Sequence, residues 1–326
     1  MFRTVFKNAS HLAVAGLLMA AAPMATAEIK SITWVVPVTP GGVVDTTGRI
    51  FAQQLADKLG VNVIVENRPG GGGIVAAEYI LNSNRSDTLY VIENTQSGAG
   101  IIDKMVKDIR YKPLEDFVPV HGLYYLPAAL VARADAPFNT TKELIAYANE
   151  NKGKLNFGTT APGGVGHFYV AKYLTATGID AEMIHYKGSA PAITDLMGGS
   201  INAMFDYLPT ALPQIESGKF KAITAMSDKR LGSLPNVPTV IEDGYPDALL
   251  LGWLGAFVKK GTSEEDIATL SKALNEILHD DDVKKLENRF GLILMRDMER
   301  EKFAKFNRDE YEKWGKLVDL LGMDLR

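Results

Sequence analysis

The stretch Ile32-Thr33-Trp34-Val35-Val36-Pro37-Val38, followed by Thr39-Pro40-Gly41-Gly42, decides the fold class. Its first part is rich in β-branched and aromatic residues and predicts a buried strand. A loop follows, because Pro and Gly at positions 39–42 continue neither a strand nor a helix. Apolar residues then recur at helical spacing over positions 46–59, with Asp45 at the expected N-cap and Gly60 at the end. Strand, glycine loop and helix in this order predict a β-α unit.

The same unit recurs along the first third of the chain. Residues 61–66 predict a second strand, which is followed by four glycines at 70–73 and a helix at 74–81. A third buried strand is predicted at 89–93, and it ends in the polar residues 94–98. Polar residues at that place are expected where the carboxyl edge of a sheet meets solvent or ligand. Alternating strands and helices predict an α/β fold with largely parallel sheets.

A second α/β series begins after the long apolar stretch at 118–133. It starts with a predicted helix at 141–151 and a strand at 154–158, and a second glycine loop follows at 159–164. The remaining elements of the series are helices at 165–175, 191–197 and around 212–215, with strands at 183–186, 203–206 and 222–226.

The end of the chain is predicted to return to the first domain. Residues 249–258 are strongly apolar, and residues 263–321 predict mostly amphipathic helix packed against that domain. We therefore expect one lobe from residues 28–124 and 248–326 and a second lobe from residues 125–247. Two chain crossings between them would form a hinge beside a ligand cleft.

The first 27 residues have the pattern of a cleaved secretory signal peptide. Arg3 and Lys7 precede an apolar stretch that is followed by Ala25-Thr26-Ala27, so cleavage is expected after Ala27. An uncleaved anchor or an early core helix is the alternative, although the apolar stretch is shorter than the roughly 20 residues of a bilayer span. Removing the leader changes the net charge from −4 to −6 and leaves 299 residues, enough for two domains. The acidic balance disfavours a nucleic-acid partner or a polybasic membrane partner. The mature chain is not expected to be membrane-embedded, because no later segment stays free of charged or turn residues for the length of a bilayer span.

Composition and spacing also disfavour several kinds of site. The chain has no cysteine, which excludes disulfides and thiolate chemistry. Its five histidines form no pair at helical spacing and no HExxH motif, so no zinc site is expected. No glycine stretch continues into the Gly-Lys-Ser/Thr of a P-loop or completes a dinucleotide fingerprint. No cofactor is predicted.

The two glycine loops, at 39–42 and 159–164, are the candidate ligand site. Each follows a strand and precedes a helix, so backbone N–H groups and the positive end of the helix can approach an anion directly. Either loop alone can equally be a tight turn, but one loop in each domain favours the anion site. Asp45 is expected to cap its helix and not to contact the ligand, because a carboxylate repels an anion.

His167, Ser189 and Asp206 raise the alternative of an enzyme. His167 lies just inside the helix after the second loop, where it contacts a ligand or fills the first turn of the helix. Asp206 ends a strand and either orients a loop or accepts from a ligand hydroxyl or protonated group. The three have the residue types of a catalytic triad, although no serine lies in a G-x-S-x-G elbow. A periplasmic hydrolase or isomerase would require a nucleophile and a base within hydrogen-bonding reach in the cleft.

Several ordered motifs make nearly all of the mature chain resemble the solute-binding proteins of tripartite tricarboxylate transporters, the Bug family. These motifs are Val36-Pro37 followed by PGGVVD at 40–45, VENRPG at 65–70, PLEDFVPV at 113–120, GKLNF at 153–157, YKGSAPA at 186–192, Phe205-Asp206 with Leu208-Pro209, and LPNVPT at 234–239.

The resemblance implies a two-lobed type-II periplasmic binding protein fold, in which each lobe is a mostly parallel sheet flanked by helices. The lobes would close over a small carboxylate, such as a di- or tricarboxylate or an aromatic acid, without catalysis. The implied partners are the permease subunits of the transporter or, alternatively, a sensor kinase. The ligand residues implied by the family motifs are Thr39, Gly41, Gly42, Asn94 and Thr95 in the first lobe, and Thr159, Gly163, Val165, His167, Asp206 and Tyr207 in the second.

The chain departs from the family pattern at three positions. Thr39 replaces a proline and adds a hydroxyl beside the expected carboxylate grip. His185 replaces a proline, and Tyr207 replaces a frequent asparagine. We expect Tyr207, together with Tyr124 or Tyr125, to favour an aromatic or otherwise flat acid.

Overall fold

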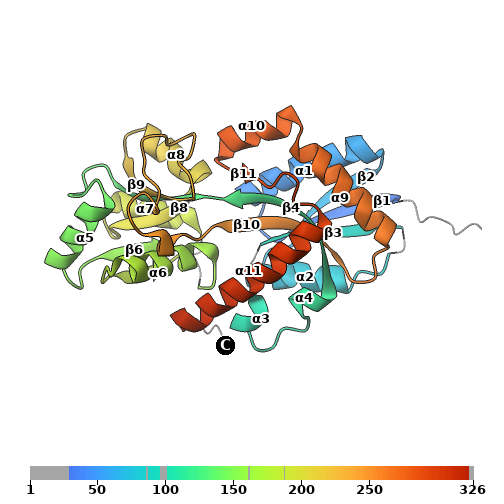
Figure 1. Ribbon diagram of the computed structural model, residues 1–326, viewed down its shortest axis with the longest axis horizontal. Helices are drawn as coiled ribbons and strands as arrows, with labels where there is room; N and C mark the ends of the chain where they lie inside the picture. The colour runs from blue at the N-terminus through green and yellow to red at the C-terminus, as the bar shows by residue number, and fades with distance from the viewer. Residues whose placement is uncertain (1–28, 86, 96–100, 161, 187, 323–326) are drawn as a thin grey trace, which may run out of the picture.

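The computed structural model describes residues 29–85, 87–95, 101–160, 162–186 and 188–322, which form two bodies, each built on its own β-sheet (Figure 1). The leader expected at 1–27 and the polar residues 96–98 lie outside these ranges. The two-lobed α/β class predicted from the sequence is confirmed.

The first body contains a six-stranded sheet in the order β11-β4-β10-β3-β1-β2. Strands β1 (Ser31–Val36), β2 (Asn62–Asn67) and β3 (Leu89–Thr95) pair in parallel. Strand β10 (Gly252–Lys259) pairs antiparallel with both β3 and β4 (Phe117–Leu126), and the short β11 (Ile293–Leu294) pairs antiparallel with β4.

The second body contains a five-stranded sheet in the order β7-β6-β8-β5-β9. Strand β6 (Asn156–Thr159) pairs in parallel with β7 (Glu182–His185) and β8 (Ala203–Tyr207). Strand β5 (Ala128–Arg133) pairs antiparallel with β8 and with β9 (Phe220–Met226).

Both sheets contain parallel and antiparallel pairs, mainly because β5 and β10, which follow the crossings between the bodies, run against their neighbours. Only Pro127 separates β4 from β5, so β5 enters the second sheet from the edge at which β6 and β8 end. Strand β10 likewise returns to the first sheet against the direction of β1 and β3. The parallel strands β1–β3 and β6–β8 thus end in loops at the edges where the chain crosses from one body to the other.

Helices cover both sheets (Figure 1). Those of the first body are α1 (Val43–Leu59), α2 (Ile74–Leu81), α3 (Ile102–Met105), α4 (Pro113–Asp116), α9 (Glu264–Leu278), α10 (Asp281–Phe290) and α11 (Arg300–Leu321), with a 3₁₀ turn at Gly71–Gly73. Those of the second are α5 (Thr141–Glu150), α6 (Val165–Thr177), α7 (Ser189–Gly198) and α8 (Leu208–Glu216), with a 3₁₀ turn at Pro246–Ala248.

Side chains cap some of the helices, whereas the helices that follow the two glycine loops have no such cap, as is also the case for α2 and α7. Thr140, Ser263 and Asp280 cap α5, α9 and α10 by accepting a hydrogen bond from a first-turn N–H group. Helices α1 and α6 begin after Gly42 and Gly164, which supply no side-chain cap.

Two predicted helix starts require correction. Helix α1 begins at Val43, so its N-cap is Gly42 and Asp45 lies in its first turn. Helix α8 begins at Leu208, well before the predicted segment, because Pro209 fits the first turn of a helix, where its missing N–H group has no intrahelical role.

Helix α11 bridges the two bodies. It packs along β4 of the first sheet, and it also reaches α6 of the second body (Figure 1). The rings of Trp314 and Phe168 meet edge to face there, with centroids 5.0 Å apart. Among the described residues, none of the helices combines the length and apolar composition that a bilayer span requires.

Candidate functional site

Each glycine loop follows a strand from which the chain continues to one side of the sheet and then to the other. Strand β1 lies between β2 and β3 in the first sheet, and β6 lies between β7 and β8 in the second. Ligands of open α/β sheets bind beyond the carboxyl ends of the strands at such positions. The geometry therefore places both predicted loops where a ligand site is expected.

The two loops have the same backbone design. Pro40-Gly41-Gly42-Val43 and Pro162-Gly163-Gly164-Val165 each place a glycine with positive φ before the N-cap, at 95° for Gly41 and 75° for Gly163. Each N-cap glycine is extended. The first N–H groups of a helix have no intrahelical partner, so α1 and α6 both present uncapped donors at these loops.

Each loop is closed by a side chain from the first turn of its own helix. The Gly41 N–H group donates to Oδ2 of Asp45 at 2.9 Å, and the Gly163 N–H group donates to Nδ1 of His167 at 3.1 Å. The N–H groups of these two glycines are therefore already paired. The donors left for a ligand begin at the N-cap residues and at Val43 and Val165.

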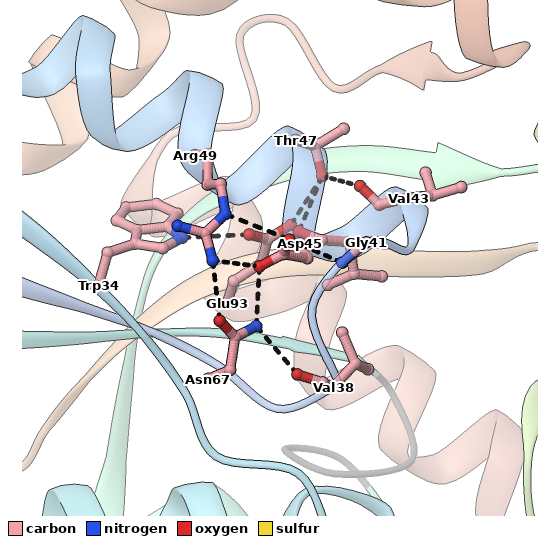
Figure 2. A network of polar contacts seen from close by, with 10 residues as sticks. Trp34, Val38, Gly41, Val43, Asp45, Thr47, Arg49, Asn67 and Glu93 are labelled. Carbon is pink, nitrogen blue, oxygen red and sulfur yellow. Dashed lines mark hydrogen bonds and ion pairs between the residues drawn. The ribbon is translucent and has the colours of Figure 1, made fainter.

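A polar network supports the first loop (Figure 2). Oδ1 of Asp45 accepts from Asn67 at 2.8 Å and from Arg49 at 2.9 Å, and Asn67 also donates to the Val38 carbonyl at 3.0 Å. Burial alone would raise the pKa of Asp45, but the hydrogen bonds from Arg49, Gly41 and Asn67 outweigh it and lower the pKa. Asp45 is thus a buried, ionised acceptor behind the loop.

Behind this network lies a second buried carboxylate, Glu93 on β3. It accepts from the Trp34 indole at 3.1 Å and from the Tyr124 hydroxyl at 2.8 Å (Figure 2 shows the Trp34 contact). Gly48 allows this close packing, because a Cβ there would lie 2.7 Å from Oε2 of Glu93. Burial raises the pKa of Glu93 to about 7.

The His167 imidazole behind the second loop is neutral. Burial, with a smaller contribution from His185, lowers its pKa to about 4. Since a backbone N–H group can only donate, Nδ1 of His167 carries the lone pair and Nε2 carries the proton. The rings of His167 and His185 meet edge to face, with centroids 4.7 Å apart. His167 also lines a surface cavity of about 470 Å³ between α6 and Leu321 of α11.

Asp206 and Thr159 lie at the carboxyl ends of the neighbouring strands β8 and β6. Oδ1 of Asp206 accepts from the Ser189 hydroxyl at 2.5 Å. Its Oδ2 and the Thr159 Oγ1 are buried and have no hydrogen-bond partner within the described residues. Burial raises the pKa of Asp206. Unpaired buried polar atoms are rare, so two of them at one sheet edge mark groups that a ligand can satisfy.

The structure separates the tyrosines that were expected to form a flat pocket. The ring of Tyr207 lies 6.4 Å from that of Tyr169 and packs between the cores of the two bodies. Tyr124 is fully buried in the first body, with its hydroxyl on Glu93, so the prediction that it joins Tyr207 at the ligand is wrong. Tyr125 instead packs edge-on against Phe306 and lines a separate cavity of about 240 Å³.

The remaining predicted residues take different positions. Thr39 and Gly42 are exposed on the first loop. Val165 packs closely against the start of β10, since a Cβ at Gly252 would lie 2.9 Å from Cγ1 of Val165. Asn94 and Thr95 end β3, and their side chains lie outside the described part of the chain.

The three residues of the enzyme alternative do not assemble as a relay. Ser189 donates directly to Asp206, and Nδ1 of His167 is occupied by the Gly163 N–H group. Within the described ranges, no three His, Asp or Glu side chains gather as they would around a metal ion.

Sequence reasoning missed the network residues Asn67 and Arg49 and the role of Asp45. A signal was present, because Pro-Gly-Gly-Val recurs at 40–43 and 162–165, with a hydrogen-bond acceptor two residues after each valine. The shared spacing indicates that Asp45 and His167 occupy equivalent positions.

The chain is similar to known proteins over most of its length. The family model described as "Tripartite tricarboxylate transporter family receptor" matches residues 47–323. BugT of Bordetella pertussis is 31% identical over 324 residues, which cover 97% of this chain and 98% of that protein.

Two solved structures of similar proteins contain an acid. An R. palustris protein with adipate has a TM-score of 0.80 and 27% identity, covering 90% of this chain and 97% of that one. MatC from Rhodopseudomonas palustris with bound malate has a TM-score of 0.76 and 27% identity, covering 89% and 99%. The match over most of its length shows that the chain belongs to the tripartite tricarboxylate transporter receptor family, to which the Bug proteins also belong.

Proposed function

We propose that this protein captures a small carboxylate in the periplasm and delivers it to the permease subunits of a tripartite tricarboxylate transporter. The observation that carries the proposal is the pair of matched glycine loops, each opening a helix without a side-chain cap at the switch point of its sheet. Adipate and malate in two similar structures support the choice of a carboxylate. Residues 1–27 are proposed to direct export and to be removed after Ala27.

The ligand carboxylate would lie between the N-termini of α1 and α6. Partial positive charge at a helix N-terminus favours an anion, and uncapped N–H groups can donate to it. The donors proposed are those of Gly42, Val43, Gly164 and Val165, because the N–H groups of Gly41 and Gly163 are already used. The exposed Thr39 hydroxyl would add a further donor beside the first loop.

The far end of the ligand would meet Thr159, Asp206 and Tyr207. Oδ2 of Asp206 and Oγ1 of Thr159 lack partners among the described residues, so a ligand hydroxyl or protonated carboxyl can hydrogen-bond there. Asn94 and Thr95 at the end of β3 are proposed to complete this end from the first lobe. A hydroxylated or long dicarboxylate fits these groups better than an apolar monoacid does.

Lobe closure would complete the site. The proposed lobes, 28–124 with 248–326 and 125–247, are connected twice. The first connection is at Pro127, two residues beyond the expected boundary, because Tyr125 and Leu126 still belong to β4 of the first sheet, and the second is the segment that enters β10. Ligand bound to one loop would gain the donors of the second loop as the lobes close. The closed form would then be the one that the permease recognises.

A thermal-shift screen of the mature protein tests the proposal. Aliphatic diacids, hydroxy diacids, tricarboxylates, aromatic acids, amino acids and sugars would be compared at equal concentration. A ligand at 100 times its Kd adds about 2.7 kcal/mol, which raises the Tm by roughly 4–5 °C in a protein of this size. A shift with one acid class and no turnover of that acid supports the proposal, whereas consumption of the acid would favour an enzyme.

A further inference from the structure

The conformation of the first glycine loop, residues 39–42, depends on contacts from side chains outside the loop. Residues 39–42 are exposed, and Gly41 adopts a positive φ of 95° that glycine can leave easily. A loop that must be ordered when the ligand arrives reduces affinity by the free energy of that ordering. Side chains that fix the loop beforehand therefore raise affinity without touching the ligand.

We infer that Asp45 is a positioning residue that holds this loop ready for the ligand, and that His167 has the same role in the second lobe. The inference rests on the proposed carboxylate site. Asp45 fixes the end of the loop through the Gly41 N–H group at 2.9 Å. Asn67 fixes its beginning through the Val38 carbonyl at 3.0 Å, and it donates to Asp45 at 2.8 Å with the same amide nitrogen.

Comparison of the two lobes separates this role from an effect of charge. Asp45 is an ionised carboxylate paired with Arg49, whereas His167 is a neutral imidazole. Both nevertheless accept from the glycine N–H group four residues earlier. Each position supplies a hydrogen-bond acceptor, an oxygen in Asp45 and a nitrogen in His167, but only Asp45 is charged. What the site requires at both positions is therefore the hydrogen bond to the loop.

The surroundings of Asp45 explain how a carboxylate is tolerated near a bound anion. Its two oxygens accept from Gly41, Asn67 and Arg49, and its side chain is 5% exposed. The Arg49 guanidinium bonds both Asp45 and Asn67, and it thereby offsets the charge while bracing the network. Asn67 comes from the end of β2, so the loop is anchored to the neighbouring strand of the sheet.

Hydrogen–deuterium exchange of the ligand-free protein tests the inference directly. Asp45→Ala should speed exchange in the peptide spanning residues 38–44 by roughly 10-fold or more, because one charge-assisted hydrogen bond is lost. Asp45→Asn keeps one acceptor oxygen and should restore part of the protection. Asp57→Ala removes an exposed acid from the same helix and should leave the loop unchanged. His167→Ala and His167→Asn give the equivalent pair for residues 162–167.

Calorimetric affinity for malate and adipate then links loop order to binding. Asp45→Ala should bind either acid about 10-fold more weakly than the parent protein, with Asp45→Asn between the two. Unchanged exchange in Asp45→Ala, or tighter binding after loss of the charge, would overturn the inference. If the variant loosens the loop but the parent protein binds neither acid, the role of Asp45 in holding the loop stands and malate and adipate are excluded as ligands.

Discussion

Trp253 donates its indole N–H to Oε2 of Glu310 at 3.1 Å and so joins the crossing strand β10 to helix α11. Trp314 donates to the same oxygen at 2.7 Å, while its ring meets Phe168 of the second body. Glu310 is buried, and its other oxygen pairs with Lys313 at 3.0 Å. One carboxylate thus holds the helix that bridges the bodies against the strand that crosses between them.

Glu310→Ala should destabilise the protein by about 2–4 kcal/mol, because the hydrogen bonds that Trp253 and Trp314 donate to this buried carboxylate are lost. Urea unfolding followed by tryptophan fluorescence measures the loss. Glu312→Ala removes an exposed acid from the same helix and should change stability by less than about 0.5 kcal/mol. Equal stability of the two variants would show that the tryptophan contacts contribute little.

Glu93 should make stability depend on pH. Its pKa is raised by burial from 4.5 to about 7, so the folded state binds the proton more tightly than the unfolded state does. The resulting stabilisation is fully present below pH 4.5 and is lost as the pH rises through 7, by up to about 3 kcal/mol. Glu93→Gln cannot titrate, so its free energy of unfolding should fall less between pH 5 and pH 8 than that of the parent protein. Parallel pH profiles would refute the assignment.

Gly291 tests the contact between α10 of the first body and α8 of the second. It has φ 63°, and a Cβ there would lie 2.1 Å from Cδ1 of Leu208. Gly60 ends α1 with a similar φ of 67°, but a Cβ added there would have nothing within 4 Å, so it is the matched control. Gly60→Ala should cost about 1 kcal/mol, and Gly291→Ala should cost about 1–3 kcal/mol more through overpacking. Equal losses in thermal unfolding would mean that Leu208 moves away freely.

Asp206→Asn should weaken binding without weakening the fold. The amide keeps the size of the carboxylate but can present a donor where a ligand hydroxyl needs an acceptor. We expect affinity for the carboxylate with the largest thermal shift to fall roughly 10-fold or more, while the Tm of the ligand-free protein stays equal or rises because a buried acid is removed. Asp180→Asn, at an exposed position of the same body, should leave both quantities unchanged. Undiminished affinity for that carboxylate in Asp206→Asn would exclude Asp206 from the site.

Local sequence patterns were sufficient to predict the units that carry the site. The strand at Ile32, the loop at Gly41 and the helix ending at Gly60 are each encoded by adjacent residues, and the two-lobed class follows from their repetition. Mixed strand direction was not predicted, because it depends on how the chain crosses between the bodies.

Side-chain contacts between residues far apart in the chain could not be predicted from the sequence. Tyr124 lies next to Tyr125 in the chain, yet alternation along β4 sends Tyr124 to Glu93 and Tyr125 to Phe306. Asp45 has the residue type and sequence position typical of a helix cap. Only the fold shows that Asn67, at the end of another strand, donates a hydrogen bond to it. Pairing of this kind is decided by tertiary packing, which a single sequence without its fold does not specify.

Isothermal titration calorimetry of the mature protein tests the central claim most directly. The carboxylate with the largest thermal shift would be titrated beside its methyl ester, which has similar shape but no negative charge. If helix N-termini and loop N–H groups hold an anion, the acid should bind at least about 100-fold more tightly than the ester. Equal affinity for acid and ester, or no binding by any carboxylate screened, would contradict the account.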